Sequence, residues 1–110
     1  MPTEPGIFEI ASGEVVISNG GDVLGLIYAH DEDNFILARE NITAAFFDLS
    51  SGIAGDVVQK LVNYRRRIAI VGDFTNLQSK SLNDFIYESN KGQTIFFVAT
   101  REDAIKKLSR

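Results

Sequence analysis

Two adjacent serines and a glycine stand where a helix is predicted to begin, and these residues are the best suited to chemistry in this chain. Ser50, Ser51 and Gly52 follow the apolar run Phe35–Ala38 and precede an amphipathic run. A helix start leaves up to four backbone N–H groups unpaired and carries partial positive charge. It can therefore bind an anion, or the phosphate of a modified serine. The simpler interpretation, which we favour, is that a serine caps the helix and contributes ~1 kcal/mol.

Two glycines at this helix start also have two interpretations. Gly52 and Gly55 permit a ligand to approach the backbone closely, or they let the helix pack tightly on a sheet. We expect packing to be the reason.

A second group of polar residues follows the predicted strands. Glu40 and Asn41 come after Phe35–Ala38, and Asp73 comes after Ile68–Val71. Open parallel sheets bind ligands beyond the carboxyl ends of their strands, so these side chains are candidates for binding a small polar or anionic ligand, or for acid–base catalysis. The alternative, which we favour, is that they are solvated turn residues, because Asp and Asn are common in turns.

Conventional catalytic patterns are missing from the sequence. His30 is the only histidine and stands beside three acidic residues. Adjacent residues rarely converge on a metal, and we expect a solvated helix end here. The sequence contains no Ser–His–Asp order, Walker loop or dinucleotide-binding glycine motif. We therefore expect no metal and no cofactor, and we favour a protein that is not an enzyme.

Composition restricts the class of protein. The net charge of −4 opposes binding to nucleic acid, and the lack of cysteine suits a reducing compartment. No signal peptide and no apolar run long enough to cross a membrane is present. These features predict a cytoplasmic protein that binds neither membrane nor nucleic acid. We expect a flexible leader at residues 1–6 and one domain over residues 7–110.

The elements that position these residues alternate between strand and helix. Phe8–Ile10 and Glu14–Ile17 flank Ser12-Gly13, a pattern that predicts a β-hairpin. A helix capped by Asp22 follows, with Leu24, Ile27 and Tyr28 on its apolar side.

The second half is more regular. A helix is predicted with an Asp56–Lys60 pair and with one apolar face, which is formed by Ala54, Val57, Val58, Leu61 and Val62. Ser81 and Thr100 each begin a capping-box pattern before a further helix. The remaining strands are predicted at Ile68–Val71 and Thr94–Val98.

This order predicts a single-domain α/β sandwich. We expect a mostly parallel sheet of about five strands, an N-terminal β-hairpin as its antiparallel edge, and about four helices.

Three long segments resemble one bacterial family. Ile42–Gly55, Ile68–Phe74 and Ser79–Gly92 are similar, in this order, to a family known only as a domain of unknown function, family four-one-eight-zero. The likeness runs from Glu40 to the C-terminus. It implies a small cytosolic bacterial protein and supplies no activity or catalytic residue.

A looser likeness concerns the sulfate-transporter/anti-sigma-antagonist (STAS) fold, in which a strand leads to an Asp-Ser-Ser-Gly-Leu loop. Leu49–Ile53 stands in that place, with Leu49 at the aspartate position and Asp48 one residue earlier. This resemblance implies regulatory phosphorylation of Ser50 or Ser51.

Two functions remain open. We favour a non-catalytic regulatory or protein-interaction module that binds a protein partner, or a second copy of itself, around Ser50–Gly55. The alternative is a small-molecule-binding protein or unassigned enzyme that uses Glu40, Asn41 and Asp73.

Overall fold

Four parallel strands form the centre of the computed structural model, which describes residues 2–4 and 6–109. They lie in chain order in the sheet: β2 (Ile7–Glu9), β3 (Asn34–Ala38), β4 (Arg67–Val71) and β5 (Ile95–Val98). β1 (Pro2–Glu4), within the predicted leader, pairs antiparallel with β2. Met1 and Pro5 of that leader, and Arg110 of the predicted domain, lie outside the described residues.

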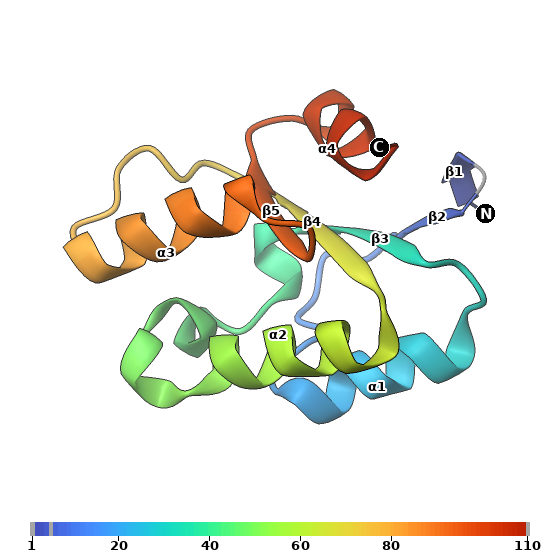
Figure 1. Cartoon of the computed structure of the whole chain (residues 1–110), viewed down its shortest axis with the longest axis horizontal. Coiled ribbons are helices and arrows are strands. Elements are labelled where there is room, and N and C mark those ends of the chain that lie inside the picture. The colour runs from blue at the N-terminus through green and yellow to red at the C-terminus, as the bar shows by residue number, and fades with distance from the viewer. Residues whose placement is uncertain (1, 5, 110) are drawn as a thin grey trace.

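Four helices cover the two faces of this sheet. α1 (Gly20–Ala29), α2 (Ile53–Tyr64) and α3 (Lys80–Lys91) pack on one face, and α4 (Arg101–Leu108) packs on the other. In Figure 1, α1 and α2 lie below the strands and α4 lies above them. The predicted α/β class and the four helices are confirmed.

The apolar runs form strands that are buried on both faces. In β3, Phe35 and Leu37 face the larger core beneath α1, α2 and α3, and Ile36 faces the smaller core beneath α4. β4 repeats this alternation with Ile68 and Ile70 against Ala69. A strand covered on two sides reads as a continuous apolar run, which is why both strands were found from the sequence.

The hairpin predicted across Ser12-Gly13 is wrong. Residues 10–16 form no strand, and Ile17 makes only an isolated parallel bridge with Ile42. The buried amide of Asn41 explains this path, because it donates hydrogen bonds to the carbonyls of Ser12 and Glu14 at 2.8 and 2.9 Å. The turn is therefore tied to the end of β3, and the antiparallel edge comes from β1.

Two helix starts differ from the predictions by a few residues. α1 is capped by Asn19, whose side chain accepts from Asp22 N, and α3 is capped by Ser79, whose side chain accepts from Leu82 N. The cap predicted at Thr100 is confirmed. Asp22 lies inside the first turn of α1 and accepts from Ser18 N at 2.8 Å.

The outer edge of β5 is covered by a side chain. Thr94 O accepts from Ile68 N of β4, and Val98 O accepts from Gly72 N directly after β4, so the peptide groups of Phe97 point away from the sheet. Asn90 of α3 meets them: its Oδ1 accepts from Phe97 N at 2.7 Å and its Nδ2 donates to Phe97 O at 3.1 Å. Since an edge strand offers unpaired groups to other chains, this amide blocks strand pairing at β5.

None of the helices in the described ranges is long and apolar enough to cross a lipid bilayer.

Candidate functional site

Hollows lie along the carboxyl ends of the parallel strands, where the sequence placed its polar candidates. The one between the ends of β4 and β5 has a volume of about 280 Å³, and we call it the β4–β5 cleft. Its lining includes Asp73, Phe74, Thr75, Ile86 and Phe97.

Asn41 has a structural role in the interior of the fold. Its side chain is fully buried, at 0% exposure. Its Oδ1 accepts from Ala38 N at 2.8 Å, while its Nδ2 donates to the two carbonyls of the 12–14 turn. A buried amide with such partners stabilises the local structure and has little left to offer a ligand.

Glu40 and Asp73 lie in different hollows. Glu40 is exposed and borders a hollow of about 370 Å³ with Val15 and Phe47. Asp73 borders the β4–β5 cleft. The structure therefore does not bring Glu40, Asn41 and Asp73 together around one hollow.

Arg39, directly after β3, connects the ends of β3 and β4. Its guanidinium lies 5.0 Å from the ring centroid of Phe47 and 5.2 Å from that of Phe74, and it donates to the carbonyl of Asp73. Gly72 leaves room for the Arg39 side chain at the end of β4, because a Cβ at position 72 would lie 2.8 Å from the Arg39 Cβ. The sequence signal was only an arginine at a strand end; of its two aromatic partners, Phe47 follows soon after in the chain, and Phe74 comes only after α2 and β4.

The carboxyl of Asp73 is bound within its own turn. Its Oδ1 accepts from the Thr75 hydroxyl at 2.6 Å and from Thr75 N at 3.0 Å. These bonds lower the pKa of Asp73, the hydroxyl most, and the positive charge of Arg39 adds to the effect. An aspartate with a lowered pKa is ionised at neutral pH and is a poor general base.

Ser50 and Ser51 hold the turn before α2 together. They lie in the 3-10 turn Leu49–Ser51, which Asp48 caps. Ser50 Oγ donates to Asp48 Oδ1 at 2.6 Å, and Ser51 Oγ donates to Ala45 O at 2.8 Å. Ser51 Oγ also accepts from Ile53 N at 3.2 Å, so it does satisfy one N–H of the helix start.

The two glycines of this region have different roles. Gly52 directly precedes α2 with φ +81°, a left-handed conformation that other residues adopt only with strain. The predicted packing of Gly55 on the sheet is wrong: Gly55 is exposed, and a Cβ there would meet nothing within 4 Å.

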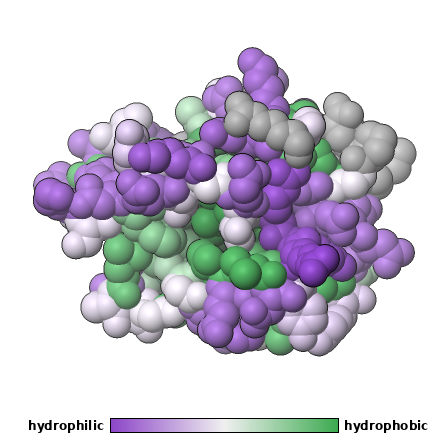
Figure 2. Space-filling view, viewed as in Figure 1, coloured by the Kyte–Doolittle hydropathy of each residue, from purple (hydrophilic) through white to green (hydrophobic). Residues whose placement is uncertain are grey.

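Gly55 lies on a side of α2 that faces away from the rest of the chain. We call Gly55, Gln59 and Val62, which are all exposed, the outer face of α2; Val58 borders it and packs partly on the core. Val62, which the sequence placed in the core, is 54% exposed. Figure 2 shows hydrophobic surface over α2, below the hydrophilic side chains that cover α3. The charged residues of α2, Asp56 and Lys60, bond to each other at 2.9 Å and Asp56 reaches α1, so the outer face is uncharged.

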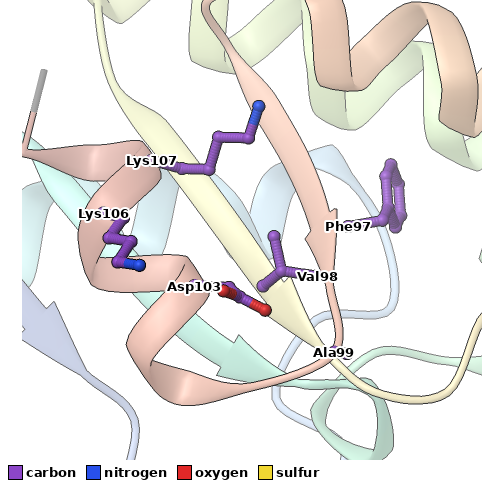
Figure 3. Close-up of a pocket in the computed structure, with 6 residues that line it drawn as sticks. All are labelled: Phe97, Val98, Ala99, Asp103, Lys106 and Lys107. Carbon is purple, nitrogen blue, oxygen red and sulfur yellow. The ribbon is translucent and has the colours of Figure 1, made fainter.

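A further hollow of about 380 Å³ lies between β5 and α4, on the opposite side of the strand from the ring of Phe97 (Figure 3). Asp103 and Lys106 give it opposite charges. Lys107, also in its lining, donates to Asn90 O at 3.1 Å and lies 5.4 Å from the ring centroid of Phe96. Lys107 therefore binds the same residue, Asn90, that covers the edge of β5.

The comparison with protein families decides where the chain belongs. A family model described as Domain of unknown function (DUF4180) matches residues 3–108. The chain belongs to this family. No curated protein and no solved structure matches this DUF4180 domain.

The described part of the DUF4180 domain contains no cluster of side chains that could hold a metal ion. His30 stacks on Phe8, with ring centroids 3.8 Å apart. The sheet end therefore offers binding groups, chiefly Asp73 beside aromatic walls, and the pKa of this carboxyl is lowered rather than raised.

Proposed function

We propose that the DUF4180 domain is a non-catalytic protein-interaction module that pairs with a second copy of itself through the outer face of α2. The observation that carries this proposal is an exposed glycine, Gly55, on an uncharged helix face. Glycine inside a helix costs ~1 kcal/mol relative to alanine, and in the described part of the chain nothing lies close enough to Gly55 to compensate for this cost. The close approach of another molecule to the backbone at Gly55 would compensate for this cost.

Two of the other helices, α3 and α4, offer no comparable surface. The outer sides of α3 and α4 carry exposed charges, among them Asp84, Glu88, Glu102 and Lys106. Pairing through the edge of β5 is blocked by Asn90. An acidic protein with net charge −4 repels its own copies except where they can meet on a surface free of charge.

The outer face of α2 is complementary to itself in an antiparallel pair. Val62 stands seven residues after Gly55, two turns along the same side of the helix. In a twofold arrangement, each Val62 fits over the Gly55 of the other copy. Arg65 follows the helix and Asp48 precedes it, and both are exposed, so opposite charges meet at each end of the same arrangement.

The experiment is the mass of the intact protein in solution over a concentration series, by native mass spectrometry and light scattering. We expect a dimer for the natural protein and a folded monomer for V62E, because the substitution places two carboxylates in the uncharged centre of the pair. The matched control is Y87E, at a tyrosine of α3 that is 63% exposed, and we expect it to remain dimeric. A natural protein that is monomeric at every soluble concentration refutes the proposal, and so does V62E if it dimerises like Y87E.

We propose further that this association is the step regulated at Ser50 or Ser51. Both serines are exposed and precede the outer face, beside the Asp48 carboxylate. Phosphates there would place several negative charges opposite one Arg65, and like-charge repulsion would loosen the pair. The likeness of Leu49–Ile53 to the STAS motif is a second reason to assign regulation to this turn.

The double variant S50E/S51E imitates such modification. We expect weaker dimerisation than in the natural protein, with S81E in α3 as a control that adds charge away from α2. Equal dimerisation of S50E/S51E and the natural protein would refute the serine switch and leave the dimer itself standing.

A further inference from the structure

The chain leaves the neighbouring strands β4 and β5 in opposite directions. After β4 it runs to α3, on the face that α1 and α2 cover; after β5 it enters α4 on the other face. Figure 1 shows the two exits parting at the ends of these strands. In open α/β sheets, ligands bind in the crevice that forms where neighbouring exits part in this way. The β4–β5 cleft lies at this point.

The inner wall of the cleft is apolar and aromatic. Phe74 and Phe97 meet edge to face, with ring centroids 5.3 Å apart and an angle of 84° between the rings. Ile86 of α3 adds an aliphatic wall. The volume of about 280 Å³ is close to the lower end of the range for ligand pockets, roughly 300–1,000 Å³, which fits a small molecule rather than a peptide.

One ionised group stands in this apolar lining. Among the described residues that line the cleft, Asp73 is the one whose side chain carries charge at neutral pH. Both bonds from Thr75 go to its Oδ1, which leaves Oδ2 for a ligand. The other polar side chains have partners, since Thr75 donates to Asp73 and Asn90 pairs with the Phe97 backbone.

We propose that the β4–β5 cleft binds a small organic cation, with its ammonium group at Asp73 Oδ2 and its apolar body against Phe74, Ile86 and Phe97. A carboxylate and an ammonium form a charge-assisted hydrogen bond, which is stronger than a neutral one. Arg39, the cation that connects β3 to β4, lies against the Phe47 and Phe74 rings and is not part of the lining. Although Arg39 acts on the pKa of Asp73, its guanidinium donates to the Asp73 carbonyl outside the lining, so the charged group that a ligand meets in the cleft is the Asp73 carboxylate.

The test is a titration of the full ¹⁵N-labelled chain, followed by the amide signals of Gly72, Thr75 and Ala99, which belong to the cleft lining. The probe is 2-phenylethylammonium, which joins a cation to an aromatic body. The counter-probe is 3-phenylpropionate, which has a similar body and the opposite charge. We expect saturable shifts of these amides with the ammonium and none with the carboxylate.

The variant D73N removes the charge and keeps an oxygen that can accept from Thr75. We expect it to bind the ammonium at least about tenfold more weakly than the natural protein. The control D84N, in α3 and outside the cleft, should bind as the natural protein does. The proposal would be overturned if the ammonium caused no saturable shifts, if D73N bound it as well as the natural protein does, or if 3-phenylpropionate bound equally well. If D73N does not fold, the comparison of the two probes on the natural protein remains decisive. Since the outer face of α2 takes no part, the result is independent of the dimer.

Discussion

The two sides of α2 differ in what fills the space beside a glycine. On the side toward α1, a Cβ on Gly20 would lie 2.3 Å from the Asp56 Oδ2 of α2. On the outer face, a Cβ on Gly55 would meet nothing within 4 Å. The first glycine is explained by a contact inside the chain, and the second is not. A residue type alone does not distinguish these cases, but its surroundings do.

Polar bonds complete the side toward α1. Asp56 Oδ2 accepts from Gly20 N at 2.9 Å, so a carboxylate of α2 satisfies an N–H at the start of α1. At the other end of the two helices, the hydroxyls of Tyr28 and Tyr64 lie 3.2 Å apart. The described outer face, formed by glycine, valine and glutamine, carries no charge that needs a partner. α2 thus has one side closed by its own chain and one side that is exposed.

The largest effect is expected where the contact is closest. In G20A, the new methyl group displaces the Asp56 carboxylate and leaves the Gly20 N–H without its acceptor. An unsatisfied buried N–H costs about 1–3 kcal/mol, so we expect the free energy of unfolding to fall by ~2 kcal/mol. Equilibrium urea unfolding at one protein concentration measures it.

The control lies in the same helix. A Cβ on Gly25 would meet nothing within 4 Å, so G25A should raise the free energy of unfolding by ~0.5–1 kcal/mol through helix propensity alone. Equal effects of G20A and G25A would show that the Gly20–Asp56 contact does not matter.

Much of the fold was predictable from the chain because strong local patterns coincide with it. β3 and β4 are apolar on both faces, and α2 carries the Asp56–Lys60 pair that its spacing predicted. The turn after β2 was not predictable, because its path depends on Asn41, a residue far along the chain whose amide binds two of its carbonyls.

The second prediction concerns the open side of α2. G55A should stabilise the isolated domain by ~0.5–1 kcal/mol, because alanine is the better helix former and there is space for its methyl group. The same methyl group occupies the place proposed for Val62 of a second copy, so dimerisation should weaken. Urea unfolding of the monomeric V62E protein, with and without G55A, isolates the first effect, and light scattering of G55A measures the second. Stronger dimerisation of G55A would contradict the proposed pairing.

The candidate site was less predictable than the fold. Asp73 was found because parallel strands place their carboxyl ends at one edge. The contact of the Arg39 guanidinium with the rings of both Phe47 and Phe74 arises from segments that only the folded chain brings together. The exposure of Val62 was not predicted, because the spacing of apolar residues on a helix does not distinguish a buried valine from an exposed one.

A smaller effect on the free energy of unfolding is expected from Asp56 when the pH is lowered. The Lys60 hydrogen bond, followed by that from Gly20 N, lowers the pKa of Asp56 below its usual 3.8. A carboxyl whose pKa is lower in the folded state contributes stability above the unfolded pKa, and this contribution is lost as the pH falls through the folded pKa. D56N should therefore be less stable than the natural protein near neutral pH and lose stability less steeply below 3.8. Urea unfolding over a pH series measures both; parallel curves for the two proteins would contradict the assignment.

The smallest effect is expected where the two helices end. The hydrogen bond with Tyr64, and then the charge repulsion between the two phenolates, raise the pKa of Tyr28 above its usual 10.0. A phenol whose pKa is raised by folding stabilises the fold below the unfolded pKa, and that contribution disappears as the pH rises through the folded value. In Y64F, the pKa of Tyr28 should fall toward its usual value, measured by ultraviolet titration of the folded protein. Y87F is the matched control, since it removes a phenol from α3 and leaves the Tyr28–Tyr64 pair in place. If Tyr28 titrates identically in Y64F and Y87F, the hydroxyls of Tyr28 and Tyr64 do not interact. The polar contacts on the side of α2 toward α1 would then be those of Asp56 and Lys60 alone among the described pairs.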